Sequence, residues 1–195
     1  MTIRDDGEIR LCAVRAEEID VYAYWMTHGQ WRQFDAPWEG VGDRWEPEAL
    51  SEFKEAFLKT ASRQGESVSK CTVYLRDDPI GWVNSYNFSV NKTSLKVGIS
   101  ICVDSCPNRG LGTRILCLWI DYWFDERRVH RIGLDTWSFN RRMIRVAQKC
   151  GFVPEGVERE VVLWDGVWQN LHHFGMTEVD RVQAKKNRGD SRPGV

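Results

Sequence analysis

Residues 102–113 read Cys102-Val103-Asp104-Ser105-Cys106-Pro107-Asn108-Arg109-Gly110-Leu111-Gly112-Thr113. An apolar run from Leu95 to Val103, typical of a strand, precedes the glycines, and a run typical of a helix follows from Thr113 to Arg127. Backbone N–H groups converge at such a junction, and the helix dipole adds partial positive charge. Glycine lets the backbone approach an anion closely because it has no Cβ atom. The stretch therefore predicts a phosphate-binding turn, to which Arg109 could add a charge-assisted contact.

The residues around the glycines narrow the kind of phosphate ligand. No Gly-Lys-Ser/Thr follows them, which excludes a P-loop. No third glycine follows at the spacing of a dinucleotide-binding turn, and the unit comes in mid-chain. The remaining interpretation is a turn for the pyrophosphate of an acyl-CoA. Arg-Gly-Leu-Gly alone is unspecific, so this interpretation depends on the sequence that follows.

A strand candidate over 131–136, Asn140 and a helix candidate over 141–148 follow the turn. This order of motifs resembles the Gcn5-related N-acetyltransferase (GNAT) superfamily, and within it the RimJ/RimL-like branch. The matching residues are Val97-Gly98-Ile99, Asn108 to Thr113, Asn140, Ile144-Arg145-Val146-Ala147, Lys149-Cys150-Gly151-Phe152, Glu155-Gly156, Arg159 and Asp165-Gly166-Val167-Trp168. The resemblance is specific from Leu95 to Met176, and from Glu8 to Phe88 it consists of element order alone.

The resemblance implies an α/β fold, the acyl-CoA acyltransferase fold, in which helices flank a central twisted mixed sheet with splayed strands. The residue patterns predict the same element order. Strands are expected over 8–14, 67–76, 80–88, 95–103, 131–136 and in a hairpin over 161–174, and helices over 16–27, 47–63, 108–127 and 141–148. One domain is predicted over 1–180, followed by a basic, disordered tail over 181–195.

Composition limits the functions further. The chain has 195 residues and a net charge of −1, with a tail of +4 and a body of −5. A mildly acidic body suits a cationic amine, although many proteins are mildly acidic. No aromatic residues interleave with the basic ones of the tail, so nucleic-acid binding is not favoured. The six cysteines lack zinc spacing, so no metal is predicted. No apolar run suits a membrane span or signal peptide, so a cytoplasmic location is expected.

The resemblance also implies which residues bind acetyl-CoA. The backbone of the central strand would pair with the pantetheine arm, and the glycine turn would bind the pyrophosphate. These positions are Ile99, Ile101, Cys102, Val103, Asn108, Arg109, Gly110, Leu111, Gly112 and Thr113. Asn140 matches an asparagine near the pantetheine, which favours a contact with the ligand, and it could also be only a helix cap. Ser138 is a weaker catalytic candidate in the same neighbourhood.

Acceptor residues are expected in the loop from His28 to Trp45, which has many aromatic side chains. In the family this region covers the acceptor. The implied pocket walls are Trp31, Phe34, Trp38 and Trp45, with packing at the edge of the core as an equal alternative. Glu158 precedes the final hairpin and could face the acceptor. Asp135, Glu160 and one of His172 and His173 are further candidate bases, because strand alternation sends the two histidines to opposite faces.

Two positions depart from the family pattern. Many members carry a glutamate base where this chain has Lys96, and a tyrosine acid where it has Ala147. A strong base is unnecessary for an α-amino group, because its pKa of about 7.7–8.0 leaves about a tenth of it neutral at pH 7. A lysine-like amine, with a pKa of about 10.4, would need about 250- to 500-fold more help. This arithmetic favours an amine of low pKa, such as a protein N-terminus.

The sequence therefore predicts an N-acetyltransferase that uses acetyl-CoA and acetylates a primary amine, on a protein N-terminus or a small cation, by direct transfer in a ternary complex. One alternative is a polyamine or aminoglycoside acetyltransferase, which an acidic, aromatic pocket would support. Another is a non-catalytic acyl-CoA-binding module. The apolar hairpin Val161–Phe174 could form the edge of a homodimer.

Overall fold

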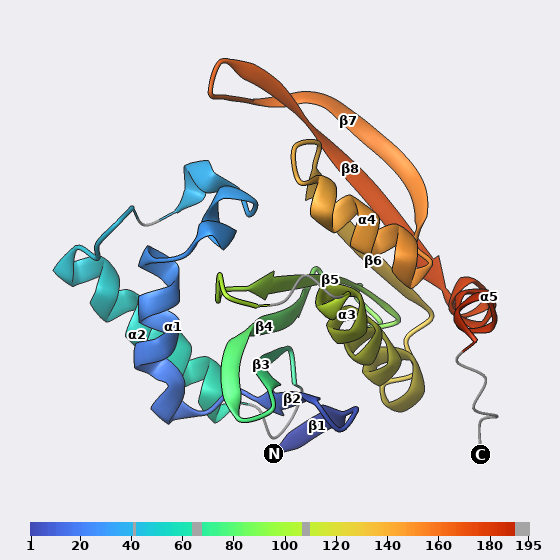
Figure 1. Ribbon diagram of the computed structural model, residues 1–195, viewed down its shortest axis with the longest axis horizontal. Helices are drawn as coiled ribbons and strands as arrows, with labels where there is room; N and C mark the ends of the chain where they lie inside the picture. The colour runs from blue at the N-terminus through green and yellow to red at the C-terminus, as the bar shows by residue number, and fades with distance from the viewer. Residues whose placement is uncertain (41, 64–67, 107–109, 190–195) are drawn as a thin grey trace. The chain divides into compact units, whose positions relative to one another are not determined.

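The computed structural model describes residues 1–40, 42–63, 68–106 and 110–189 (Figure 1). The chain divides into two compact units. The first unit comprises residues 1–84 and 99–109, and the second comprises 85–98 and 110–195. The single domain predicted over 1–180 stays a prediction.

The strands form a mixed sheet. They are β1 (Thr2–Asp5), β2 (Ile9–Ala13), β3 (Lys70–Leu75), β4 (Asp78–Tyr86), β5 (Ser94–Ile101), β6 (Arg131–Trp137), β7 (Val153–Trp164) and β8 (Val167–Thr177). Their hydrogen-bonded order is β1-β2-β3-β4-β5-β6-β8-β7. β5 and β6 are parallel, whereas β2–β3, β3–β4, β6–β8 and β7–β8 are antiparallel. The mixed α/β fold class predicted from the sequence is confirmed.

The helices begin and end where local signals place them. They are α1 (Ile19–Thr27), α2 (Pro47–Ser62), α3 (Leu111–Asp121), α4 (Arg141–Cys150) and α5 (Glu178–Arg188). Pro47 stands at the first turn of α2, where its missing N–H costs nothing. The helix predicted to reach residue 127 changes after α3 into a π-helical turn over Tyr122–Glu126.

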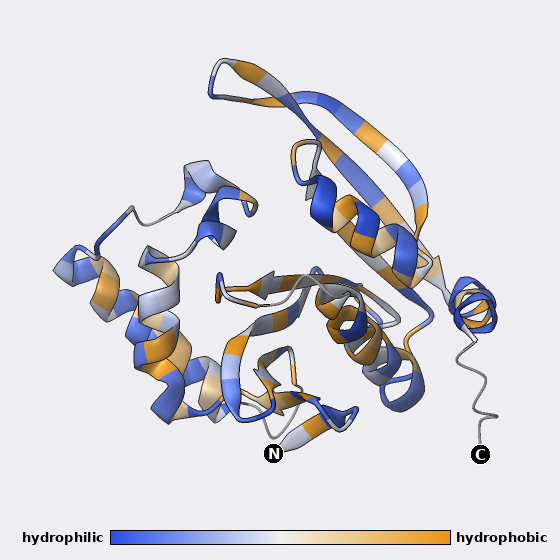
Figure 2. Cartoon of the chain, viewed as in Figure 1, coloured by the Kyte–Doolittle hydropathy of each residue, from blue (hydrophilic) through white to orange (hydrophobic). Residues whose placement is uncertain are grey.

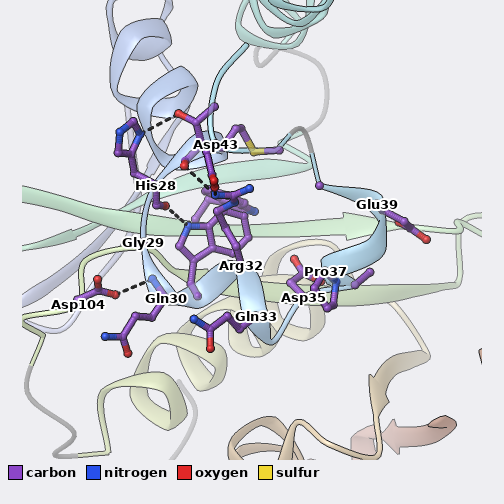
Figure 3. A pocket seen from close by; sticks show the side chains of 16 residues that line it. His28, Gly29, Gln30, Arg32, Gln33, Asp35, Pro37, Glu39, Asp43 and Asp104 are labelled. Carbon is purple, nitrogen blue, oxygen red and sulfur yellow. Dashed lines mark hydrogen bonds and ion pairs between the residues drawn. The ribbon is translucent and has the colours of Figure 1, made fainter. Parts of the chain in front are cut away.

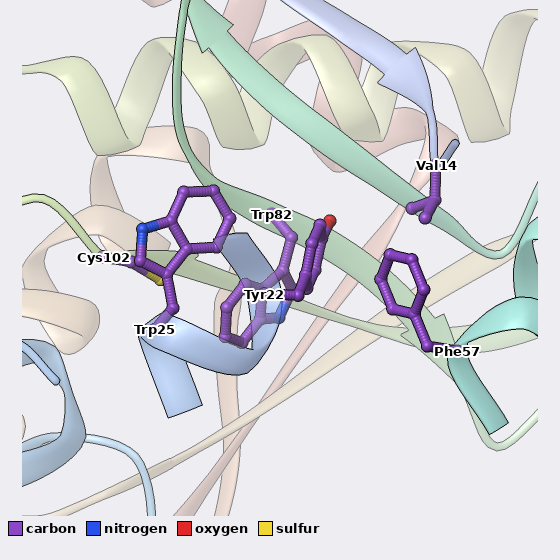
Figure 4. Close-up of a cluster of buried hydrophobic side chains, with 6 residues drawn as sticks. All are labelled: Val14, Tyr22, Trp25, Phe57, Trp82 and Cys102. Atoms are coloured by element: carbon purple, nitrogen blue, oxygen red, sulfur yellow. The ribbon is translucent and has the colours of Figure 1, made fainter. Parts of the chain in front are cut away.

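The core of the first unit contains an aromatic cluster, to which α1, α2 and β4 contribute side chains (Figure 4). Tyr22 is at its centre and is fully buried. Its ring centroid lies 5.2 Å from that of Trp25, 4.8 Å from that of Phe57 and 5.4 Å from that of Trp82. Large rings in contact bury much apolar area, so this cluster holds α1 and α2 against the strands of the unit.

In the second unit α3 packs against α4, and α4 packs against β6. Ile115 and Trp119 of α3 are completely buried. The parallel ladder between β5 and β6 ends at the pair Lys96–Gly133, although both strands continue. β5 and β6 are therefore paired only along their first residues, as expected for two strands that separate beyond that point.

The hairpin of β7 and β8 turns at Asp165-Gly166, as predicted, with φ of +48° and +71°. Figure 2 shows hydrophobic and hydrophilic residues alternating along both strands. Several apolar side chains of the hairpin are exposed, among them Leu163 and Trp168.

The chain after residue 180 corrects one expectation. The tail over 181–195 was predicted to be disordered, but α5 extends to Arg188, and residues 190–195 lie outside the described part. Thr177 and Asp180 form a capping box at the start of α5. Arg181 is buried and donates to Asp121 at 2.8 Å. Arg181, one of the charged residues that suggested a disordered tail, therefore holds α5 to Asp121.

We expect Arg181→Met to lower the free energy of unfolding by about 2 kcal/mol. Its guanidinium also bonds Asp125 at 2.5 Å and Glu178 at 3.1 Å, so the variant leaves three carboxylates without this cation. Breaking a buried pair costs about 3–5 kcal/mol, and the partial exposure of these carboxylates reduces that cost. Urea unfolding tests this, with exposed Lys186→Met as the control. Equal stability of the two variants would contradict the anchoring role.

Candidate functional site

The first unit contains a cavity of about 780 Å³ (Figure 3). Its walls come from the end of α1, the segment 28–43, Trp82 on β4 and the chain after β5. Arg32 holds the segment in place, because its guanidinium donates to the carbonyl oxygen of Thr27 at 2.7 Å and to the carboxylate of Asp43 at 3.3 Å. A cavity of this volume is typical of sites for small molecules.

Two tryptophans form an aromatic wall of the cavity. The ring of Trp31 stands edge-on to that of Trp82, with centroids 5.0 Å apart and planes at 82°. The indole N–H of Trp31 donates to the carbonyl oxygens of Trp25 and His28, each at 3.1 Å. These bonds fix the ring, so Trp31, a predicted acceptor residue, is a rigid part of the wall.

The other predicted aromatic residues lie elsewhere. Phe34 and Trp38 belong to the same segment but are not among the described residues that line the cavity, and their role stays a prediction. Trp45 packs on Phe53 at a centroid distance of 4.9 Å and donates to the carbonyl oxygen of Ala23 at 2.8 Å. Packing at the edge of the core, the alternative kept open above, therefore describes Trp45.

The cavity is acidic. Asp35, Glu39, Asp43 and Asp104 line it, and among its described lining residues Arg32 alone carries a fixed positive charge. That charge is already paired with Asp43. A concave site with an excess of carboxylates concentrates cations.

The surroundings of Asp35 in the cavity raise the pKa of its carboxyl group. Asp35 is an exposed residue of the cavity wall, but its carboxyl group lies among protein atoms and is partly removed from water. This burial raises the pKa of Asp35, the negative charge of Glu39 raises it further, and a hydrogen bond from Ser100 lowers it. Asp35 was not among the residues predicted from the sequence, because a lone acidic residue in a loop carries no signal that its carboxyl group is buried.

The end of β5 lies beside the cavity. Gly29, a lining residue, has φ +97°, and a Cβ atom on it would lie only 3.0 Å from the carbonyl oxygen of Cys102. Ser100, on the same stretch, bonds Asp35. Four predicted pantetheine positions, Ile99, Ile101, Cys102 and Val103, thus belong to the stretch of the first unit that borders the acidic cavity.

The N-terminus of α3, in the second unit, suits an anion. Gly110 is its N-cap with φ +77°, and a Cβ atom there would meet no atom within 4 Å. The first turn, which includes Leu111, Gly112 and Thr113, holds no acidic residue. The N–H of Thr113 donates to the carbonyl oxygen of Gly110 at 3.0 Å, which leaves the N–H groups of Leu111 and Gly112 at the start of the helix for an anion. The geometry fits a pyrophosphate; Asn108 and Arg109, predicted to contact it, lie outside the described residues.

Asn140 and Ser138 have structural partners. The side-chain oxygen of Asn140 accepts the N–H of Met143 at 3.0 Å, so Asn140 caps α4. The hydroxyl of Ser138 donates to Gln169 at 2.9 Å and accepts the N–H of Asn170 at 3.1 Å. The cap interpretation of Asn140 is confirmed, and a catalytic role for either residue stays a prediction.

A charged ladder crosses four strands of the second unit. Asp135 of β6 accepts from Lys96 of β5 at 2.5 Å and pairs with Nδ1 of His173 at 2.8 Å. Nε2 of His173 pairs with Glu158 at 2.7 Å. The bond to Asp135, and then that to Glu158, raises the pKa of His173 against the effect of burial. Glu158, a predicted acceptor residue, is thus held by His173.

The two departures from the family pattern are structural residues here. Lys96 is the outer member of the ladder, and its ammonium is paired. Ala147 is completely buried in α4, and its carbonyl oxygen accepts the N–H groups of Gly151 and Phe152. Neither side chain could act as the familiar base or acid.

Two kinds of feature are absent from the described part of the chain. It holds no group of three His, Cys, Asp or Glu side chains placed to bind a metal ion. None of its helices is both long and apolar enough to cross a membrane.

Known proteins resemble the chain in sequence. A family model described as acetyltransferase (GNAT) domain matches residues 8–153. The probable N-acetyltransferase YjcK of Bacillus subtilis (strain 168) is 37% identical over 86 residues, which are 44% of this chain and 48% of that protein. The chain thus aligns over about half the length of the curated relatives it matches.

Solved structures resemble it in fold. Spermidine N-acetyltransferase from Vibrio cholerae, in complex with CoA and spermine, superposes with a TM-score of 0.72 at 18% identity, covering 91% of this chain and 99% of that one. RimL, the ribosomal L7/L12 alpha-N-protein acetyltransferase in complex with CoA, has a TM-score of 0.72 at 12% identity, covering 91% and 98%. The GNAT fold predicted from the sequence is confirmed.

Proposed function

Since the chain belongs to the acetyltransferase (GNAT) domain family, we propose that it transfers the acetyl group of acetyl-CoA to a primary amine of a small cationic molecule. The observation that carries the choice of acceptor is the cavity of the first unit. It combines four carboxylates with the rigid wall of Trp31 and Trp82. Carboxylates attract an ammonium group, and aromatic faces accept one by cation–π contact.

Two parts of the chain would hold acetyl-CoA, which supplies the acetyl thioester. The first-turn N–H groups of α3 would bind the pyrophosphate. Backbone groups of the stretch Ile99–Val103 would bind the pantetheine arm, and an N–H of this stretch would stabilise the negative charge that develops on the thioester oxygen.

The acetyl group would pass directly to the amine within a ternary complex. Covalent transfer through a cysteine requires a thiolate. Cys102 and Cys106 are the thiols at the end of β5, and burial raises the pKa of both. Thiols that stay protonated are poor nucleophiles, which favours the direct route.

A protein N-terminal amine is the second candidate acceptor. Lys96 and Ala147 occupy the positions of the familiar base and acid, and an amine of low pKa depends least on such groups. The fold shared with RimL is compatible with this acceptor. A cytoplasmic location and a homodimer formed through the hairpin of β7 and β8 are also kept as proposals.

Incubation with acetyl-CoA and a pooled panel of amines tests the proposal. The panel contains polyamines, aminoglycosides, amino acids and peptides with free N-termini, and mass spectrometry reads the products. We expect acetylated polyamines or aminoglycosides in preference to peptides. Acetylated peptides alone would overturn the small cationic acceptor. No product, with acetyl-CoA bound by calorimetry, would overturn catalysis and leave an acyl-CoA-binding module.

A further inference from the structure

We infer that Asp35 is the catalytic base, the group that takes the proton from the ammonium of the acceptor before the amine attacks the thioester. The inference rests on the proposed function and names a base that was not among the candidates Glu158, Asp135, Glu160, His172 and His173. It would supply the base that the chain lacks at Lys96.

Asp35 is placed to meet an amine bound in the cavity. Asp35 lies between two short 3-10 turns of the cavity segment, Gln30–Gln33 and Pro37–Glu39, and lines the cavity (Figure 3). Its carboxylate accepts a hydrogen bond from Ser100, a residue of β5 that is 8% exposed. A carboxylate offers about four acceptor positions, so this bond orients Asp35 and leaves room for an ammonium donor.

The other carboxylates of the cavity have different surroundings. Asp43 bonds Arg32 at 3.3 Å, and its side chain is fully exposed. Asp104 accepts the backbone N–H of Gln30 at 3.0 Å. A general base works best when its pKa approaches the working pH, and burial raises the pKa of Asp35 in that direction.

The groups that face Asp35 set the direction of each effect. Glu39 belongs to the turn over Pro37–Glu39, and its charge opposes ionisation of Asp35. Ser100 of β5 donates to the ionised form and favours it. The thiol of Cys102, which follows β5, is within electrostatic reach of Asp35, but it stays neutral because burial raises its pKa.

In the proposed reaction Asp35 takes the first proton, and the CoA thiolate takes the second. An N–H bond of the ammonium breaks, and its proton goes to an oxygen of Asp35 and from there to water. The freed lone pair forms the C–N bond to the thioester carbonyl carbon, and the C–S bond breaks with its electron pair on sulfur. The nitrogen then loses a second proton, which the CoA thiolate accepts. The products are the N-acetylated amine and CoA.

Steady-state kinetics with the best amine of the panel test the inference. We expect Asp35→Asn to lower kcat at least about 100-fold, the usual contribution of a general base. Asp43→Asn removes a cavity charge that pairs with Arg32, and Arg32 keeps its bond to the carbonyl oxygen of Thr27, so this variant should raise KM with little change in kcat. Asp77→Asn, at an exposed surface ion pair with Arg10, should change neither constant.

The pH dependence of kcat/KM adds a readout that a structural role would not move. The acid limb should shift to higher pH in Ser100→Ala, to lower pH in Glu39→Gln, and disappear in Asp35→Asn. Thermal unfolding checks that each variant is folded. Ser100 is buried, so Ser100→Ala could be unstable; Glu39 is exposed, so Glu39→Gln still provides the test in that case.

The outcomes separate this inference from the proposed function. If the wild-type protein turns over the amine and Asp35→Asn has the same kcat, the role of Asp35 alone is overturned. The same holds if the acid limb of the pH profile stays in place in Glu39→Gln. A wild-type protein that acetylates no amine of the panel would overturn both.

Discussion

Replacing Gly110 with valine is expected to weaken CoA binding about 100-fold. Gly110 caps α3 with φ +77°, and its carbonyl oxygen accepts the N–H of Thr113 at 3.0 Å and of Arg114 at 3.1 Å. A β-branched residue is strained at positive φ by up to about 3 kcal/mol. The first turn of α3 relieves this strain only by changing its conformation, which moves the N–H groups proposed to bind the pyrophosphate. That energy corresponds to about 100-fold in Kd.

Gly166→Val is the matched control, and calorimetric titration with CoA is the measurement. Gly166 has φ +71°, and a Cβ atom on either glycine would meet no atom within 4 Å. Both variants therefore strain the backbone in the same way without a steric clash of the new side chain at Cβ. Gly166, however, lies in the turn between β7 and β8. The Kd of the control should stay close to that of the wild type. Equal losses in both variants would show that the loss is not specific to α3.

Much of the fold could be predicted because its signals are local. The helix α4 begins at the cap Asn140 and ends at Gly151, whose φ of +98° suits a glycine at the C-terminal cap. The turn Asp165-Gly166 fixed the place of the final hairpin. Signals of this kind act within a few residues, so one sequence is enough to find them.

The terminal elements were missed for lack of apolar periodicity. β1 (Thr2–Asp5) is a four-residue edge strand, and only its pairing with β2 makes it a strand. α5 is largely charged, and its stability depends on the ion pairs of Arg181 with distant carboxylates. The capping box from Thr177 to Asp180 was a local signal that could have indicated where α5 begins.

The candidate site was only partly predictable because its chemistry comes from contacts between distant segments. The aromatic segment 28–45 pointed to Trp31, but the hydrogen bond that orients Asp35 comes from Ser100 of β5. Strand alternation predicted that one of two histidines would face a functional side, and pairing across β6 and β8 brings His173 to Asp135. Pairing registers of this kind are not written in either strand alone.

Gly29→Ala is expected to lower kcat/KM for the amine about 30-fold. The added Cβ atom would lie 2.9 Å from Cδ1 of Trp31 and 3.0 Å from the carbonyl oxygen of Cys102, at φ +97°. The carbonyl belongs to the backbone, and the ring is held by two hydrogen bonds, so neither moves away easily. The cavity wall must therefore shift away from the end of β5. A misplacement that costs about 2 kcal/mol in the transition state corresponds to this factor.

Gly7→Ala separates the cost of the backbone from the shift of the wall. Gly7 has φ +94°, nearly that of Gly29, and a Cβ atom there would meet no atom within 4 Å. Both variants should lose stability in thermal unfolding, because alanine resists positive φ at either site. Only Gly29→Ala should also lose kcat/KM. If equal losses of stability left kcat/KM unchanged in both, the wall of this cavity could not be what positions the amine, and the acceptor would have to bind elsewhere on the chain.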